Sequence, residues 1–257
     1  MKDRIAIISG GSSGIGKATA CELAAQGVRI VLVARKETAL LAAREEIIAR
    51  TGASCLEWVV GDVCEEWVTA ACIDKCLDTW NAAPDIFVAS AGRGLPGTLI
   101  TSDQEAWDTL IDVNIKGLMR QLRCISQHMK SRTSPDRDFI SHPLDIVVVG
   151  STIGRNVSPF NSVYGATKFA AHGLTEALRR ELGPLGIRVT LVEPGLTGTN
   201  FQETAGYDLQ WFESYSREVG PILTPQDVAT VIRYIVGFPG NVHMDNVSIR
   251  PTRQAYP

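Results

Sequence analysis

The chain has 257 residues, of which 45% are hydrophobic and 21% are charged, a balance typical of a folded globular protein and not of a disordered chain. Its 25 lysines and arginines against 28 aspartates and glutamates give a net charge of −3, which argues against a nucleic-acid-binding protein. No apolar run approaches the roughly 18 residues that a membrane-spanning helix needs. The first apolar stretch, residues 5–8, is too short for a secretion signal.

The cysteines and histidines also limit the kind of protein this can be. The six cysteines are spread over half the chain without a C-x-x-C pair, as in a protein whose thiols stay reduced. We therefore expect a cytoplasmic protein that binds neither nucleic acid nor membrane. The four histidines, at positions 128, 142, 172 and 243, lack the spacing of metal ligands, so we expect no metal site.

Short β-rich runs alternate with longer helical patterns along the chain, and no repeat or domain boundary interrupts them. We expect strands at residues 4–9, 29–33, 55–60, 86–89, 146–149, 188–192 and 247–249. We expect helices at residues 15–26, 38–50, 65–80, 104–130, 162–182 and 225–236. Strands that are apolar on both faces and alternate with helices predict a parallel sheet covered on both sides. The predicted fold class is therefore a doubly wound, Rossmann-type α/β sheet in a single domain.

Local signals mark two helix ends and two long loops. Gly27 is placed to end the first helix, and Thr224 with Pro225 is placed to begin the last one. Residues 131–143 are polar and contain two prolines, which predicts a surface excursion. Residues 196–223 lack a clean period, which predicts a mobile lid over a site.

Three glycines, Gly10, Gly14 and Gly16, lie where the first strand meets the first helix, in the run S-G-G-S-S-G-I-G. A turn this tight needs positive φ or a missing Cβ. It also points backbone N–H groups and a helix N-terminus at whatever lies above, which suits a pyrophosphate. The alternative is an ordinary tight turn, but the position between strand and helix favours dinucleotide binding.

The residues after the second strand select between the two nicotinamide dinucleotides. An acidic residue there binds the ribose 2′-OH of NAD, whereas a basic one accommodates the 2′-phosphate of NADP. Here Arg35 and Lys36 come before the first carboxylate, Glu37, which favours NADP(H). Asp62, after the third strand, is in position to contact an adenine edge. The alternatives are that both cations are solvated loop residues and that Asp62 only caps a helix.

Tyr164 and Lys168 are four residues apart near the start of a predicted helix, so their side chains share one face. A fixed cation lowers the pKa of a phenol from about 10, which lets the phenol exchange a proton with an alcohol or a carbonyl. Ser151 comes directly after the fifth strand, at the edge where open α/β sheets place ligands. Taken singly, the pair is typical of exposed helix residues and the serine of a turn. Together they predict an active site.

In this order, the motifs resemble those of the classical short-chain dehydrogenase/reductase family. The resemblance adds Ala91-Gly92, Asn114 and Pro194-Gly195, and it covers the whole chain. It implies a sheet of about seven parallel strands, hydride transfer to or from a nicotinamide nucleotide, and a homotetramer. Residues 1–150 would bind the cofactor, and residues 151–257 would carry the catalytic groups and the substrate lid.

The resemblance also implies a role for each matching residue. Tyr164 would be the acid and base, and Ser151 would orient the carbonyl. Lys168 would hold the nicotinamide ribose and tune Tyr164. Asn114 would complete a water relay to Lys168, or, as the alternative, satisfy backbone groups in a helix kink. The implied cofactor-binding residues are Gly10, Ser12, Ser13, Gly14, Ile15, Gly16, Arg35, Asp62, Val63, Ala91, Gly92, Tyr164, Lys168, Pro194, Gly195, Thr197 and Thr199.

The sequence departs from the family's pattern at two places. Ser9 stands before the glycine loop where Thr is usual, which is a conservative change. The family's Asn-Asn-Ala-Gly is Ala89-Ser90-Ala91-Gly92 here. The second change puts a structural hydrogen bond in doubt but removes no catalytic group.

Three runs near the C-terminus are similar to those of NADP-dependent 3-hydroxy acid dehydrogenases of the serine dehydrogenase type. They are E-P-G-L-T-G-T-N-F (193–201), L-T-P-Q-D-V-A (223–229) and N-V-S-I-R-P-T-R-Q (246–254). Two other functions stay open: a general ketone, 3-oxoacyl or sugar reductase of the same family, and a nucleotide-binding sensor without turnover. The intact Ser151, Tyr164, Lys168 and Asn114 argue against the sensor.

Two arginines follow the fourth and fifth strands, on loops that face the nicotinamide end of the site in this architecture. Arg93 comes directly after Ala91-Gly92, and Arg155 lies four residues after Ser151. Either could hold a substrate carboxylate in a bidentate fork. The alternative is that one or both point to solvent or pair with a nearby acid.

Overall fold

Seven parallel strands form one sheet in the order β3-β2-β1-β4-β5-β6-β7 in the computed structural model, which describes residues 1–256. The strands are β1 (Ile5–Ser9), β2 (Arg29–Ala34), β3 (Leu56–Val60), β4 (Ile86–Ala89), β5 (Leu144–Val149), β6 (Ile187–Pro194) and β7 (Asn246–Ile249). The order reverses at β1, which pairs with β2 on one side and β4 on the other. The prediction of a doubly wound α/β sheet in one domain is confirmed.

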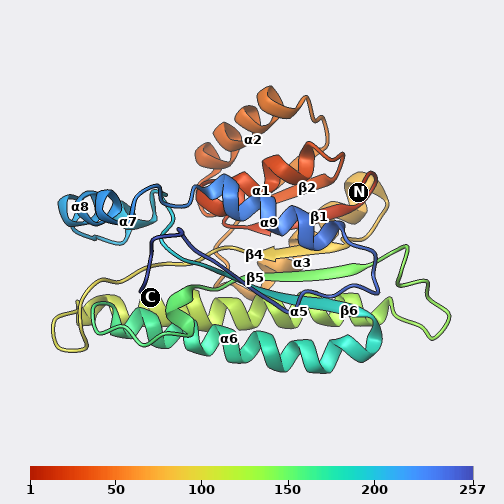
Figure 1. Cartoon of the computed structure of the whole chain (residues 1–257). Coiled ribbons are helices and arrows are strands. Elements are labelled where there is room, and N and C mark those ends of the chain that lie inside the picture. Colours follow the sequence, from red (N-terminus) through yellow and green to blue (C-terminus); the bar gives the residue numbers. More distant parts are fainter. Residues whose placement is uncertain (257) are drawn as a thin grey trace.

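Helices cover both faces of the sheet (Figure 1). They are α1 (Gly14–Ala24), α2 (Glu37–Thr51), α3 (Glu66–Trp80), α4 (Trp107–Ile111), α5 (Leu118–Ser131), α6 (Ser162–Leu182), α7 (Phe201–Thr204), α8 (Leu209–Val219) and α9 (Pro225–Gly237). In the part of the chain described, no helix has both the length and the apolar character of a membrane span.

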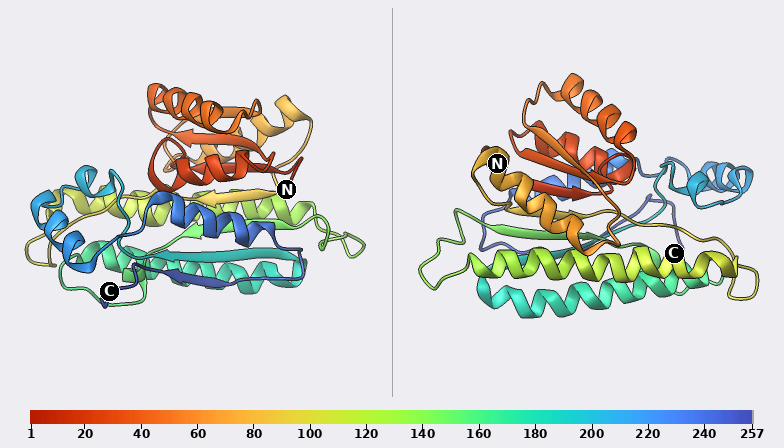
Figure 2. Two further views of the ribbon diagram at one scale, coloured as in Figure 1. Left: turned by 45° about the horizontal axis from the view of Figure 1, so that its top comes forward. Right: turned by 180° about the vertical axis from the view of Figure 1, so that it is seen from behind.

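The sheet separates two apolar cores. Helices α1, α2 and α9 bury Leu23, Leu40 and Ile232 against one face, and α3, α5 and α6 pack on the other, where Ile125 and Leu182 are buried (Figures 1 and 2). All five residues of β1 and all eight of β6 are buried, because central parallel strands are covered on both faces. The apolar, β-branched run at residues 5–8 favours a buried strand, whereas β6 also buries the polar side chains of Arg188, Thr190 and Glu193.

The predicted ends of two helices are close to the observed ones. Helix α9 begins as predicted, with the Thr224 side chain accepting from the N–H of Asp227 and Pro225 in the first helical position. Helix α1 ends at Ala24 and not at residue 26. Gly27 follows it with φ of +78° and donates its N–H to the carbonyl of Ala24 at 2.9 Å.

The stretch predicted as one helix at 104–130 contains a widened turn. A 3₁₀ turn (Gln104–Ala106) and α4 lead into a π-helical turn (Asp112–Gly117), which continues as α5. A Cβ on Gly117 would lie only 3.3 Å from the carbonyl oxygen of Val63, so the helix approaches the loop after β3 closely at this point. Turns of this kind often occur at functional sites, and this one carries Asn114.

Residues 196–223, which lack a helical period in the sequence, contain two helices. Helices α7 and α8 project from the end of the sheet at which the strands finish (Figures 1 and 2). Asp208 caps α8 by accepting from the N–H groups of Gln210 and Trp211. The predicted lid is therefore a helical segment.

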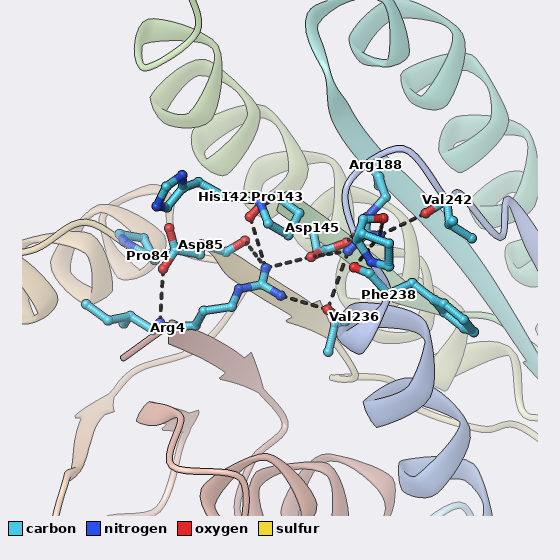
Figure 3. A network of polar contacts seen from close by, with 12 residues as sticks. Arg4, Pro84, Asp85, His142, Pro143, Asp145, Arg188, Val236, Phe238 and Val242 are labelled. Atoms are coloured by element: carbon cyan, nitrogen blue, oxygen red, sulfur yellow. Dashed lines mark hydrogen bonds and ion pairs between the residues drawn. The ribbon is translucent and has the colours of Figure 1, made fainter. Parts of the chain in front are cut away.

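The opposite end of the sheet is held by a buried charge network (Figure 3). Asp145 on β5 accepts from Arg188 on β6 at 2.7 and 2.9 Å and from Arg4 at 2.6 Å. Arg188 also donates to the carbonyls of Phe238 and Val242. The network therefore joins β1, β5 and β6 to the end of α9. Residues 131–143 lie at this end too, on the surface as predicted.

Candidate active site

The glycine loop after β1 is closely packed against the loop after β4. Gly10 has φ of +67°, and a Cβ there would lie 2.9 Å from the backbone nitrogen of Ala91. A Cβ on Gly16 would lie 2.4 Å from the carbonyl oxygen of Gly10. Real Cβ atoms do not fit at such distances, so both glycines are required for this turn. The turn brings the start of α1 beside Ala91-Gly92.

The first turn of α1 is open to an anion. Ser13 at the N-cap makes no side-chain hydrogen bond to the helix, and the first turn contains no acidic residue. Its free N–H groups and the positive end of the helix dipole therefore suit a pyrophosphate. Thr199 lies beside Gly14, since a Cβ on the glycine would be in ordinary van der Waals contact with its methyl group, at 3.7 Å. The segment that leads into α7 therefore lies next to the glycine loop.

The neighbouring loops after β2 and β3 carry the two residues expected to contact the adenosine half of a dinucleotide. Arg35 directly follows β2 and is exposed. Asp62 is placed next to it, because the N–H of Gly61 bonds to the carbonyl of Ala34 at 3.0 Å. Asp62 accepts from the N–H of Cys64 at 2.9 Å and does not cap α3, whose N-cap is residue 65. Val63, beside it, is buried.

Ser151, Tyr164 and Lys168 come together at the ends of β5 and α6. All three are less than a tenth exposed. Ser151 accepts from the N–H of Ile153 at 3.2 Å, and its side chain is close enough to the phenol of Tyr164 to act on the pKa of that group. The ammonium of Lys168 lies 5.8 Å from the centre of the Tyr164 ring and donates to the carbonyl of Val149 at 3.1 Å. Helical spacing places the phenol and the ammonium on one face, as predicted.

Burial governs the acidity of this pair. It raises the pKa of Tyr164 above that of an ordinary phenol, Tyr207 acts in the same direction, and the nearby Ser151 side chain opposes both. Burial also lowers the pKa of Lys168 to about 8. The sequence predicts a lowered phenol pKa, and the structure differs because burial outweighs the other effects. Tyr164 is therefore protonated at neutral pH, which suits a proton donor.

Asn114 joins three segments of the site. Its side-chain oxygen accepts from the N–H of Arg93 at 2.8 Å, and its side-chain nitrogen donates to the carbonyl of Arg93 at 2.8 Å and to Thr167 at 3.0 Å. This matches the alternative role, satisfying backbone groups at a helix irregularity. The same amide lies near the ammonium, because a Cβ on Gly92 would be 3.6 Å from Asn114 Oδ1 and 3.8 Å from Lys168 Nζ.

The segment after β6 is fixed by β7 and the C-terminal tail. Gly195 donates its N–H to the carbonyl of Ile249 at 2.7 Å. Thr197 donates its hydroxyl to Gly195 at 3.0 Å, and its carbonyl accepts from Gln202. Pro194, the last residue of β6, therefore begins a segment that leads over the glycine loop to Thr199. The predicted nicotinamide-binding residues lie in this segment.

The two arginines differ in their surroundings. Arg155 forms a bidentate ion pair with the fully buried carboxylate of Glu193, with N–O distances of 2.8 to 3.2 Å. Removing the partner of a buried carboxylate costs up to about 3–5 kcal/mol. The structure therefore favours a pair with a nearby acid over a substrate clamp at Arg155. The guanidinium of Arg93 has no hydrogen bond or ion pair with any residue from 1 to 256.

Four residues near the catalytic group are absent from the sequence predictions. Phe201 of α7 lies edge-on to Tyr164, with ring centres 5.8 Å apart, and Tyr207 lies beside Phe201. His172 and Glu193 lie behind Ser151. The position of His172, four residues after Lys168, is a signal that helical spacing offers. Nothing in the sequence indicates that the lid aromatics cover Tyr164.

Comparison with known proteins places the chain in a family. A family model described as short chain dehydrogenase matches residues 4–210. The chain belongs to the short-chain dehydrogenase family. This short-chain dehydrogenase is 31% identical to an uncharacterized oxidoreductase of Staphylococcus saprophyticus over 251 residues, 98% of each chain.

Solved structures agree with this assignment. The short-chain dehydrogenase is similar to the closed form of a serine dehydrogenase in complex with NADP⁺, with a TM-score of 0.83 and 27% identity over 98% of this chain and 96% of that one. A 3-ketoacyl-(acyl-carrier-protein) reductase of Brucella melitensis in complex with NADH has a TM-score of 0.81 at 24% identity, with 98% of each chain covered. The predictions of family and of an oxidoreductase acting on CH–OH groups are confirmed.

Proposed function

We propose that this short-chain dehydrogenase uses NADP(H) to interconvert a small hydroxy compound and its carbonyl, and that the compound is a 3-hydroxy acid. The observation that carries the reaction is the convergence of Ser151, Tyr164 and Lys168 in a buried site. Ala91-Gly92 connects that site to the glycine loop, since it contacts Gly10 on one side and approaches Lys168 on the other. A dinucleotide above the glycine loop would thus reach the catalytic group.

The residues along this edge fit a nicotinamide dinucleotide. The uncapped first turn of α1 would hold the pyrophosphate. Arg35 would hold the 2′-phosphate in a bidentate fork. The first two residues after β2 are the cations Arg35 and Lys36, so no carboxylate there would repel the phosphate. When bound, the cofactor supplies or accepts the hydride. Residues 1–150 would thus bind the cofactor, and residues 151–257 would supply the chemistry and the lid.

The side chains of the protein would carry out the proton transfer that accompanies hydride transfer. Because burial favours the protonated form of Tyr164, its hydroxyl would donate a proton to the carbonyl oxygen during reduction. The phenolate that this leaves would take the proton of the alcohol during oxidation. Ser151, which lies beside Tyr164 at the end of β5, would donate its hydroxyl to the same carbonyl oxygen and hold it in line. Lys168, with a pKa lowered to about 8, would exchange protons readily near neutral pH and would hold the nicotinamide ribose.

Arg93 would bind the carboxylate of the substrate. It follows Ala91-Gly92, and its backbone is fixed by Asn114, while its guanidinium is uncommitted among the described residues. The similarity to a serine dehydrogenase at 27% identity supports a small 3-hydroxy acid. Arg155 is left out of this proposal because Glu193 engages it.

A general ketone reductase is the second candidate. Leu95, Ile153 and Phe201 form an apolar cluster with Tyr164, which would favour a substrate without a charged group. Absorbance assays with NADPH and NADP⁺ over small hydroxy acids, ketones and sugars identify the substrate class. A 3-hydroxy acid that reacts faster than its methyl ester supports the acid, and equal rates support the ketone reductase. Arg93→Ala should remove the difference between acid and ester.

Assembly and location complete the proposal. Helices α5 and α6 lie side by side on one face of the molecule and carry the exposed apolar side chains of Met119 and Phe169 (Figure 2). We expect these faces to pair across a two-fold axis and β7 to form a second interface, which together give a closed homotetramer. A monomer mass by light scattering at micromolar concentration would contradict this. All six cysteines are free, which fits a reducing compartment such as the cytoplasm.

A further inference from the structure

A chain of hydrogen bonds lies behind Ser151. The backbone N–H of Ser151 donates to Nε2 of His172 on α6 at 3.3 Å. The other ring nitrogen, Nδ1, lies 3.2 Å from Oε1 of Glu193 on β6. The imidazole fits tightly under the turn after β5, because a Cβ on Gly150 or Gly154 would lie 2.5 or 2.4 Å from Nε2.

The donors in this chain fix the tautomer of His172. A backbone N–H can only donate, so Nε2 must be the unprotonated nitrogen of a neutral ring. The ring proton is then on Nδ1 and donates to Glu193. Burial lowers the pKa of His172 to about 4; Glu193 opposes this effect, and Lys168 and Arg155 add to it, so the neutral ring is the form present near pH 7.

Glu193, at the end of this series of hydrogen bonds, is held in place by several partners. Its side chain is fully buried, and it accepts from Arg155 at 2.8 to 3.2 Å and from Asn246 of β7 at 3.1 Å. The positive charge of Arg155 balances the carboxylate. With these three partners around it, the Glu193 carboxylate holds the imidazole ring of His172 in one orientation.

Two hydrogen bonds thus hold Ser151 beside Tyr164. Its Oγ accepts from the N–H of Ile153 at 3.2 Å, and its own N–H donates to His172 at 3.3 Å. We propose that His172, oriented by Glu193, is a positioning residue that holds the backbone of Ser151 so that its hydroxyl stays directed at Tyr164. The effect of His172 on turnover rests on the proposed function, whereas the hydrogen bond between Ser151 and His172 does not.

Two variants of His172 test the catalytic consequence. His172→Phe keeps the ring and removes both nitrogens, and it should lower kcat about 10-fold or more while the Kd for NADPH stays within about twofold, because small displacements of reacting groups are costly. His172→Gln restores an acceptor near the position of Nε2 and should recover most of the kcat. A purely structural role would not produce this recovery. Unchanged kcat in a folded His172→Phe, or equal losses in both variants, would overturn the proposal.

Hydrogen exchange tests the bond without any substrate. The amide proton of Ser151 should exchange slowly in the wild type and in His172→Gln, and about 10-fold faster or more in His172→Phe. Equal exchange in wild type and His172→Phe would overturn the proposal. If His172→Phe fails to fold, the smaller His172→Leu takes its place. Ser151→Ala separates the two hypotheses: if that variant keeps full turnover, the proposed function fails, and the exchange result still decides the role of His172.

Discussion

Phe201 of the lid lies edge-on to Tyr164, with the two ring centres 5.8 Å apart. This contact connects the proposed acid–base residue to α7, which lies outside the sheet. Phe201 also closes the space above Gly94, where a Cβ would lie 2.7 Å from its ring. The lid therefore contributes to the burial that raises the pKa of Tyr164.

Phe201→Ala should change the pH dependence of the reaction. Burial raises the pKa of Tyr164, so admitting water should lower that pKa toward the ordinary value of about 10. Oxidation needs the deprotonated phenol as base, so its rate should begin to rise at a lower pH in the variant than in the wild type. Trp211→Ala is the matched control, because Trp211 is an exposed lid aromatic that stacks on Tyr215. Identical pH profiles for all three proteins would contradict this account of the lid.

Arg35→Ala should weaken NADPH binding selectively. A charge-assisted hydrogen bond is worth roughly 1.5–3 kcal/mol, which corresponds to about a 10- to 150-fold rise in the Kd for NADPH. NADH has no 2′-phosphate, so its Kd should stay unchanged and serves as the internal control. Fluorescence titration with both nucleotides measures this. Equal losses for NADPH and NADH would remove Arg35 from the choice of cofactor.

Arg188→Met should destabilise the fold without affecting catalysis. It leaves Asp145, which is 1% exposed, with Arg4 as its remaining cationic partner, and breaking a buried pair costs about 3–5 kcal/mol in the free energy of unfolding. Asp145 and Arg188 lie near the beginnings of β5 and β6, whereas Ser151 follows the end of β5, so kcat at low temperature should be normal. Arg180→Met, which breaks an exposed and solvent-screened pair with Glu176, should shift the unfolding curve far less. Urea unfolding curves that shift equally for both variants would contradict this difference.

The regular part of the fold follows from local patterns. Buried strands such as β1 are continuous apolar runs, and the start of α9 follows from Thr224 and Pro225 alone. The π-helical turn that carries Asn114 could not be predicted this way, because its causes are distant in sequence: the bonds to Arg93 and the contact between Gly117 and the loop after β3. Tertiary contacts override the helical period there.

The candidate site, too, contains residues that local spacing predicts and contacts that it does not predict. The spacing of Tyr164 and Lys168 places them on one helix face, and continuing that spacing by four residues leads to His172. The spacing of the histidines excludes His172 as a metal ligand, and nothing in that spacing indicates that His172 accepts a hydrogen bond from Ser151. The pairing of Arg155 with Glu193 joins residues 38 positions apart, and no local pattern indicates it.

Turnover of Tyr164→Phe is the most direct test of the proposed chemistry. The variant loses one hydroxyl and should keep the fold, measured by circular dichroism, and the Kd for NADPH, measured by fluorescence. With the best substrate from the assay panel, its kcat should fall at least about 100-fold, the scale expected when a general acid and base is lost. A folded Tyr164→Phe protein with wild-type affinity for NADPH and near-wild-type kcat would contradict the account.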